Sequence, residues 1–290
     1  MARDIYQEVT DRIIAALETG AAPWLRPWRD GKSGSSLEPF NAVSGRPYNG
    51  INLLILGSMP FASLGWVTFK QALELGGNVR KGEHGTTVIF WKFDDYKKRE
   101  DDGSETLKTS VFARGYTVFN VEQCENLDMT KLKVPVAPKA GETDMNAVAT
   151  RVGAIVRHGG NRAFYTTKGD YVQIPGVEAF KSVDNYQSTL AHELTHWTGN
   201  EKRCAREFGK RFGDAAYAFE ELVAEIGSAF LCARHGIALD GLQHPQYVAN
   251  WLSVLKGDKR AIFTASSKAK EAAGFLMADR ADDSEERAAA

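Results

Sequence analysis

Residues 190–198 read Leu-Ala-His-Glu-Leu-Thr-His-Trp-Thr and contain the pattern His-Glu-x-x-His. On a helix, His192 and His196 are four residues apart, so both side chains project from the same face about one turn apart. Glu193 lies beside that face, where it can act as a general base on water without binding the metal itself. The pattern predicts a zinc site for amide hydrolysis, and manganese or cobalt could take the same ligands.

The five-residue pattern also occurs by chance, and two histidines on a helix are often ordinary surface residues. Leu190, Leu194 and Trp197 favour a metal-binding helix over a chance pattern, because they give this helix an apolar side. Burial of that side would hold the two imidazoles in place. A catalytic zinc also needs a third protein ligand, which must come from another element.

Residues 217–231 form a second amphipathic helix in which Glu221 and Glu225 share one face. Two carboxylates on one face repel each other unless a positive group lies beside them, and a metal with its imidazoles would supply that group. We predict that Glu221 is the third ligand and that Glu225 orients a histidine. The order Glu-x-x-Ala-acidic resembles the third-ligand helix of thermolysin-like and IrrE-like peptidases, which favours this assignment. The reverse assignment, with Glu225 as the ligand, stays open, and Glu220 is expected to face solvent.

The composition limits the class of protein. With 290 residues and 43% hydrophobic residues, the chain can bury one large core or two modest ones. The net charge of −1 argues against a uniformly basic nucleic-acid-binding protein, although a local basic face remains compatible with it. Three cysteines without a Cys-x-x-Cys pair predict a reduced, cytoplasmic protein. No apolar run has the roughly 18 residues that a membrane span needs, so no membrane partner is expected.

The N-terminal part predicts a small α+β domain. Its expected elements are helices over 4–19, 51–58 and 68–75 and two partner strands over 86–92 and 109–120. The charged segment 94–108 between the strands is expected to be a solvated hairpin tip or a mobile loop. Between residues 21 and 92 there are eight Lys or Arg against four Asp or Glu, together with four of the six tryptophans. Aromatic and cationic side chains interleaved on loops suit single-stranded nucleic acid. The alternative is that the tryptophans are core residues of a plain interaction module.

Three motifs in this part resemble a known family. They are Asn41-x-x-Ser-Gly-Arg-x-Tyr-x-Gly-Ile-Asn52, Trp66-x-Thr-Phe69 and Val79-Arg-Lys-Gly-Glu-x-Gly85. They resemble the N-terminal domain of ArdC-type plasmid antirestriction proteins, which is similar to the N-terminal region of conjugative-plasmid primases. The resemblance covers about residues 3–125 and implies single-stranded DNA binding. The predicted DNA-binding residues are Trp24, Arg26, Trp28, Arg46, Tyr48, Asn49, Arg80, Lys81 and Trp91.

The C-terminal part has the element order of a zincin. A helix over 144–158 and a hairpin of strands 162–165 and 170–174 precede the His-Glu-x-x-His helix, which is expected to begin near Asn185. In a zincin the sheet edge lies along the cleft and binds an extended substrate. The segments 191–199 and 217–225 also resemble the metallopeptidase domain of ArdC-type proteins. Tyr165 and Tyr217 are candidates for a hydroxyl that stabilises the transition state.

We therefore predict an α+β protein with two domains: a single-stranded-DNA-binding domain (1–127), a linker (128–143), a zincin-like (gluzincin) metallopeptidase domain (144–278) and a flexible tail (279–290). The resemblance implies an antirestriction protein that protects incoming conjugative plasmid DNA from type I restriction. Its protein substrate is unidentified and could belong to the restriction or DNA-processing machinery. The alternative is a non-catalytic DNA-occluding protein with a structural or vestigial metal site. A structural zinc has four protein ligands, and the sequence offers no convincing fourth.

Overall fold

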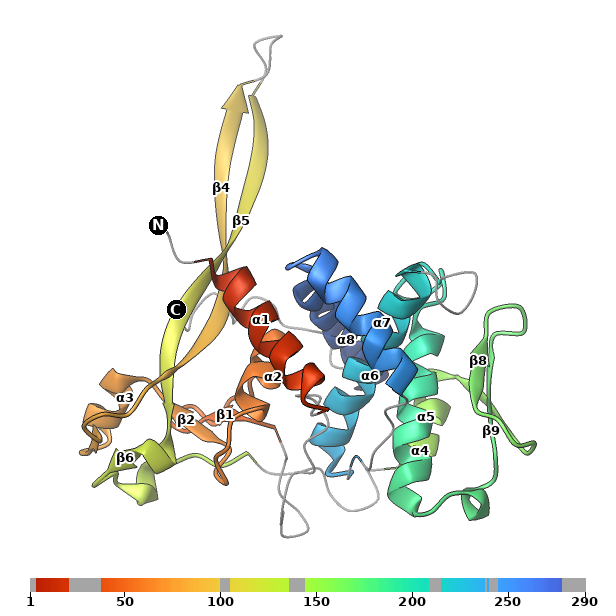
Figure 1. The fold of residues 1–290 in the computed structure, drawn as a ribbon, viewed down its shortest axis with the longest axis horizontal. Helices are drawn as coiled ribbons and strands as arrows, with labels where there is room; N and C mark the ends of the chain where they lie inside the picture. The colour runs from red at the N-terminus through yellow and green to blue at the C-terminus, as the bar shows by residue number, and fades with distance from the viewer. Residues whose placement is uncertain are drawn as a thin grey trace.

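The computed structural model describes residues 4–20, 38–99, 105–135, 144–208, 215–237, 239 and 245–277 of the chain. Helices and sheets are mixed in both halves, which confirms the predicted α+β class (Figure 1). The elements of the N-terminal half are α1 (Ile5–Glu18), β1 (Phe40–Asn41), α2 (Ile51–Gly57), β2 (Gly65–Val67), α3 (Phe69–Glu74), β3 (Asn78–Val79), β4 (Thr86–Arg99), β5 (Glu105–Asn120), η1 (Val121–Gln123), β6 (Cys124–Glu125) and η2 (Met129–Lys131).

The N-terminal half is built on a four-stranded sheet in the order β1-β2-β5-β4, with a separate two-stranded β3–β6 sheet. Strand β4 pairs antiparallel with β5 over the whole length of β4, and the two strands project from the body as a two-stranded ribbon (Figure 1). Residues 94–99 and 105–108 therefore belong to the strands of this hairpin, although the whole segment 94–108 was expected to be a solvated hairpin tip or mobile loop. Mixed charges on a two-stranded ribbon are compatible with strand structure because both faces can remain in water.

Helix α1 illustrates how the sequence determines its local structure. The Asp4 side chain accepts a hydrogen bond from the Gln7 amide and so caps the helix. Val9, Ile13 and Leu17 recur at four-residue spacing and are all buried. Helix α1 therefore turns one apolar stripe toward the rest of the protein.

The C-terminal half consists of a three-stranded sheet and five helices among the described residues. Its elements are α4 (Met145–Val152), β7 (Ile155–His158), β8 (Phe164–Thr166), β9 (Tyr171–Ile174), η3 (Val177–Ala179), α5 (Val183–Thr198), α6 (Ala215–His235), α7 (Pro245–Gly257) and α8 (Ala261–Met277). The sheet order is β7-β9-β8, with β9 parallel to β7 and antiparallel to β8. The predicted hairpin thus corresponds to β8 and β9.

The expected helix over residues 144–158 was wrong in its second half. Helix α4 ends at Val152 because Gly153 adopts the left-handed conformation, with φ at 75°. The chain then forms β7, whose residues Ile155 and Val156 suit a strand. Helices α7 and α8 were not anticipated.

Helix α5, which carries the His-Glu-x-x-His pattern, is packed on several sides by α4, α6, α8, β8 and β9. Its approach to α6 is close: a Cβ on Gly227 would lie 2.5 Å from Thr195 Cγ2, so only glycine fits there. Leu190, Leu194 and Trp197 are buried. Close packing keeps the side chains of α5 and α6 that face each other in fixed relative positions.

One hydrophobic core extends from the N-terminal to the C-terminal half and includes residues of α1, α2, α5, α6 and α8. Helix α1 lies beside α7 (Figure 1), and the Thr10 hydroxyl donates to the Lys259 carbonyl at 2.8 Å.

The predicted domain boundaries remain a prediction. The Lys133 amide donates to the Ala42 carbonyl, so residues just after 127 lie against the N-terminal half. Residues 136–143 of the predicted linker and the tail 279–290 lie outside the described residues.

Across the described residues, no helix combines the length and the apolar character that crossing a membrane requires.

Candidate metal centre

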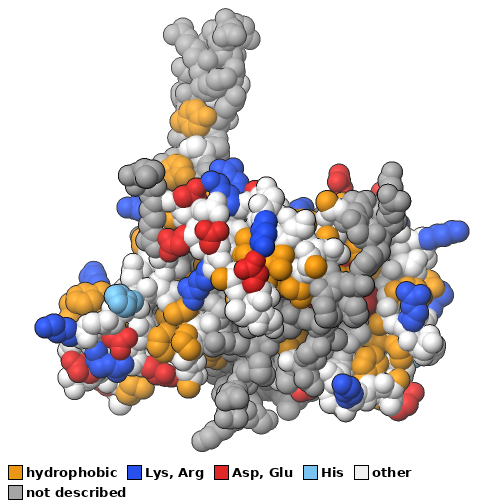
Figure 2. Space-filling view, viewed as in Figure 1, with side chains coloured by type: hydrophobic (Ala, Val, Ile, Leu, Met, Phe, Trp, Pro, Cys, Tyr) orange, Lys and Arg blue, Asp and Glu red, His pale blue; other side chains and the backbone are white. Residues whose placement is uncertain are grey.

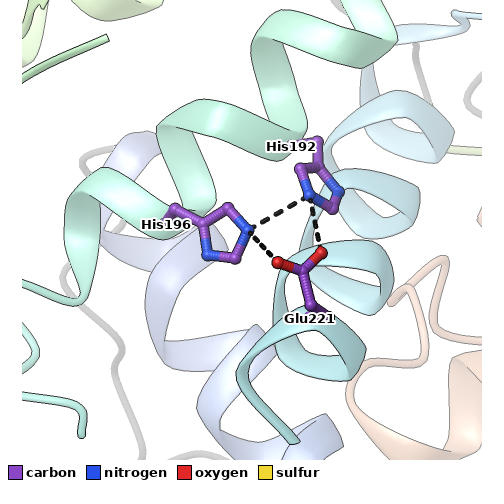
Figure 3. Close-up of side chains that lie close together, drawn as sticks. All are labelled: His192, His196 and Glu221. Atoms are coloured by element: carbon purple, nitrogen blue, oxygen red, sulfur yellow. Dashed lines mark hydrogen bonds and ion pairs between the residues drawn. The ribbon is translucent and has the colours of Figure 1, made fainter. Parts of the chain in front are cut away.

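Helices α5 and α6 bring His192, His196 and Glu221 together (Figure 3). The Nε2 atoms of the two histidines are 3.1 Å apart. Glu221 directs one carboxylate oxygen at each of them, with both Nε2–Oε distances at 3.6 Å. One nitrogen from each histidine and one oxygen of Glu221 all lie within 4.8 Å of one another. Three donor atoms at such distances can bind one ion between them.

Each histidine has its other ring nitrogen near a further carboxylate. Nδ1 of His192 lies 3.4 Å from Glu225 Oε2, and Nδ1 of His196 lies 3.1 Å from Glu220 Oε1. Glu225 thus contacts the far side of an imidazole, the position in which such a carboxylate orients a ligand. Carboxylates in this position leave Nε2 of each ring directed at the centre.

Glu220 does not face solvent as expected; it is 3% exposed. Its carboxylate accepts hydrogen bonds from Arg206 at 2.8 Å and 3.0 Å. Arg206 also donates to the Thr195 carbonyl and the Thr198 hydroxyl. The Glu220 carboxylate can be buried because Arg206 and His196 both contact it and compensate its charge. The sequence showed three acidic residues on one helix, but the arginine that pairs with Glu220 comes from a loop and carries no local signal.

These contacts set the charge state of the centre. Burial lowers the pKa of His196, but hydrogen bonds to Glu220 and Glu221 outweigh burial and raise it to about 9. Burial likewise opposes the positive charge on His192, while Glu221 and Glu225 raise its pKa well above the usual value. Burial raises the pKa of Glu221, yet the two histidines dominate and hold it well below its ordinary range. The centre therefore favours positive charge between its carboxylates.

Glu193 lies next to the three converging side chains and is also buried. Burial raises the pKa of its carboxyl, and the two histidines oppose that rise. The backbone amide of Tyr165, in strand β8, donates a hydrogen bond to the same carboxylate. Edge strand β8 therefore runs beside Glu193, and a raised pKa suits a group that must accept and release a proton.

The two tyrosines proposed as hydroxyl donors differ in their surroundings. The Tyr165 hydroxyl donates to Asp170 Oδ1 at 3.0 Å, and Arg203 binds the same carboxylate. Its hydroxyl is thus part of a clamp between the β8–β9 turn and the loop after α5. Tyr217 interacts with Glu221, and burial and that carboxylate raise its pKa. Of the two, Tyr217 has its hydroxyl at the centre.

The residues present fit a divalent metal ion. Two imidazole nitrogens and one carboxylate oxygen are a donor set that zinc and other first-row divalent ions accept. Among the described residues, these three are the cluster with metal-ligand geometry, and it contains no fourth protein ligand. Such a set leaves a coordination position open.

The predicted DNA-binding residues differ in their surroundings, and their role stays a prediction. Trp24, Arg26 and Trp28 lie outside the described residues. Tyr48 is buried, and burial raises the pKa of its hydroxyl, so its ring cannot stack on a base. The others that were predicted are exposed: Arg46, Asn49, Arg80, Lys81 and Trp91.

Two of these exposed residues also have structural contacts. Arg80 forms an ion pair with Glu83 at 2.7 Å, which reduces its availability to phosphate. Trp91 is 39% exposed and packs against Tyr6 and Phe263 at the base of the ribbon. Its indole therefore attaches the ribbon to α1 and α8.

Two family models match the chain. Residues 3–119 match the N-terminal domain of anti-restriction factor ArdC, and residues 143–268 match a zincin-like metallopeptidase. The protein y4eC of Sinorhizobium fredii is 38% identical over 290 residues, which cover 96% of this chain and 93% of the relative. Two DNA primases TraC of Escherichia coli are 36% and 35% identical over 95% of this chain, which spans 27% and 20% of their lengths.

Two crystal structures of the antirestriction ArdC protein from plasmid R388 are similar to this structure. The metal-free form is 40% identical with a TM-score of 0.76, and the alignment covers 95% of this chain and 97% of that one. The Mn(II)-bound form is 38% identical with a TM-score of 0.77, over 97% and 100% of the two chains. The similarity thus extends over both halves of the fold.

Proposed function

The chain belongs to the ArdC family of antirestriction proteins, with a zincin-like domain in its C-terminal half, and on that premise we propose a function for each half. The C-terminal half hydrolyses peptide bonds at a divalent-metal centre, and the N-terminal half binds single-stranded DNA. Together they protect incoming conjugative plasmid DNA from type I restriction. The protein acts in the cytoplasm of the cell that receives the DNA.

The observation that carries the peptidase proposal is the convergence of His192, His196 and Glu221 beside the buried Glu193. We assign the first three as ligands of zinc and Glu225 as the group that orients His192. Manganese also fits this donor set, and a relative with the same fold is described as Mn(II)-bound.

When bound, the metal supplies a Lewis acid that polarises the scissile carbonyl and lowers the pKa of water. Glu193 accepts the proton of the attacking water and passes it to the leaving amine, since its pKa is raised toward the working range. Tyr217 donates a hydrogen bond to the oxygen that becomes negatively charged. Strand β8 has an edge that can pair with an extended substrate backbone beside Glu193. The substrate is a protein met near incoming DNA, for example a component of the restriction machinery.

A second candidate function is occlusion of single-stranded DNA without catalysis. Under this alternative the metal site is structural or vestigial, and DNA binding alone protects the plasmid. A three-ligand centre favours catalysis over a structural role, because structural zinc sites have four protein ligands.

Two measurements test the proposal. Metal analysis of the wild type and His192→Ala, with a casein digestion beside it, should show a bound divalent ion and peptidase activity in the wild type alone. Titration with single- and double-stranded oligonucleotides at two salt concentrations should show salt-dependent preference for single strands. Absence of metal and of digestion contradicts the first assignment, and absence of salt-dependent DNA binding contradicts the second.

A further inference from the structure

The β4–β5 ribbon exposes two different faces. Residues alternate between faces along each strand, and the register pairs Lys92 with Phe112 and Phe90 with Arg114. All even-numbered positions of both strands therefore share one face, called here the even face. The odd-numbered positions, such as Trp91 and Leu107, share the opposite face.

The odd face is attached to the body near its base. Trp91 packs against Tyr6 of α1 and Phe263 of α8. A Cβ on Gly115, next to Trp91 on this face, would lie 3.2 Å from the Ile5 side chain, so α1 covers the ribbon here. Helix α1 lies beside the base of the ribbon (Figure 1). The even face packs on the core at the base through Val88 and Val118 and is exposed further along the ribbon.

The even face carries aromatic rings in contact with cations. Phe90 and Tyr116 pack edge to face at 5.4 Å at its base. The Arg114 guanidinium lies 5.7 Å from the Tyr116 ring centroid, and the Lys92 ammonium lies 5.8 Å from the Phe112 ring centroid. A cation near the face of an aromatic ring is attracted by the ring. This arrangement places a stacking surface beside a positive charge, which matches a ligand that has a flat ring and a negative charge.

Two rings of this face are exposed beyond the base, with Phe112 at 42% and Tyr96 at 48%. Hydrophobic side chains are visible on the part of the ribbon that stands outside the body (Figure 2). Phe112 pairs with Lys92, and Tyr96 lies four residues beyond Lys92 on β4, so the two exposed rings lie roughly 13 Å apart along the ribbon. This distance is comparable to the length of two nucleotides in an extended single strand.

Charge supports the same assignment. Among the ribbon side chains that the structure describes, the charged ones are Lys92 and Arg114, and both lie on the even face. The described part of this face therefore carries the positive charge that a polyanion requires.

We propose that the even face of the β4–β5 ribbon is a binding track for single-stranded DNA. Bases stack on Phe112 and Tyr96, and Lys92 and Arg114 bind the phosphates on either side. The inference rests on the proposed DNA-binding function and locates it on residues other than those predicted from the sequence motifs. A protein partner is disfavoured, because Lys92 and Arg114 lie near the Phe112 and Tyr116 rings and a hydrophobic interface core is depleted of charge.

The test compares matched variants of the full-length protein by fluorescence anisotropy with a labelled oligothymidylate of about 15 nucleotides. The test variant is Tyr96→Ala/Phe112→Ala. The control is Leu107→Ala, which removes the side chain that is 72% exposed on the odd face. The test variant should bind about ten- to hundredfold more weakly, and the control should stay within about twofold of the wild type. Circular dichroism and the metal content of both variants should match the wild type.

A second pair tests the phosphate contacts. In Lys92→Ala/Arg114→Ala, the slope of log K against log salt should become shallower by an amount that corresponds to about two phosphate contacts. Lys168→Ala, at an exposed lysine between β8 and β9, should leave the slope unchanged. If the wild type binds DNA and both even-face variants bind equally well, the inference is overturned while the proposed function stands. If the wild type does not bind DNA, the proposed DNA-binding function fails. If the even-face variants bind DNA like the wild type but lose antirestriction activity, the face binds a protein partner instead, and the inference is also overturned.

Discussion

Glu220 Oε1 lies 3.1 Å from Nδ1 of His196, and both side chains are buried. The contact fixes the imidazole so that Nε2 faces His192 and Glu221. Arg206 binds both oxygens of the Glu220 carboxylate, so the carboxylate is itself held in place. His196, which we propose as a metal ligand, is thus positioned by a pair of groups that do not touch the proposed metal position.

Glu220→Gln is therefore expected to weaken metal binding by about 10- to 100-fold, because the charged partner of His196 is lost while its shape is kept. The measurement is a competition titration of the folded protein with a chromophoric chelator. Glu201→Gln, an exposed carboxylate after α5, is the control and should bind like the wild type. Equal affinity of the wild type and Glu220→Gln would contradict an orienting role.

Substitutions of Glu221 and Glu225, the other two glutamates of this group on α6, should affect metal binding differently. Glu221→Ala removes a ligand and should abolish stoichiometric metal binding, whereas Glu225→Ala should keep the ion with an affinity about 10- to 100-fold lower. The ratio of metal to protein after gel filtration distinguishes them. The opposite result, with loss of metal only in Glu225→Ala, would make Glu225 the third ligand.

The metal-free protein should lose stability as the pH rises. The pKa of His196 is about 9 in the folded protein and near 6.5 when unfolded, so the folded state binds the extra proton between these values. Its contribution is complete below about pH 6.5 and disappears as the pH passes about 9, with a loss on the order of 3 kcal/mol at most.

Urea unfolding in the presence of a chelator, from pH 6 to about 9.5, measures this loss. Saturating zinc should remove the trend, because a bound metal displaces the proton from the ring and its affinity increases with pH. A chelated protein whose free energy of unfolding stays constant over this range would show that His196 is not protonated.

The sequence predicted the centre of the site better than its surroundings. His192, His196, Glu221 and Glu225 lie on two helices, and the four-residue spacing places side chains on a common face wherever a helix forms. Those two helices were therefore sufficient to bring the four groups together. Glu220 was wrongly predicted to face solvent, because the amphipathic pattern of α6 does not reveal its partner Arg206, which lies in a loop before the helix.

The limits of helix α4 and of the ribbon could not be obtained from periodicity. Gly153 ends α4 through a left-handed backbone conformation, although the apolar spacing continues past it into β7. The ribbon continues through a charged segment because cross-strand pairing on a two-faced hairpin does not need apolar residues. Tyr48 belongs to a motif that also builds the core, so a motif alone does not separate binding residues from packing residues.

The central claim is that hydrolysis at the metal centre contributes to antirestriction, and Glu193→Gln tests it most directly. This variant keeps the shape of the side chain and all three metal ligands but cannot accept a proton. The measurement is the efficiency of plasmid transfer into a restricting recipient, with metal content determined on the purified protein and Glu201→Gln as control. We expect wild-type metal content, peptidase activity lower by about 100-fold or more, and loss of protection. Full protection by metal-loaded Glu193→Gln would contradict the account.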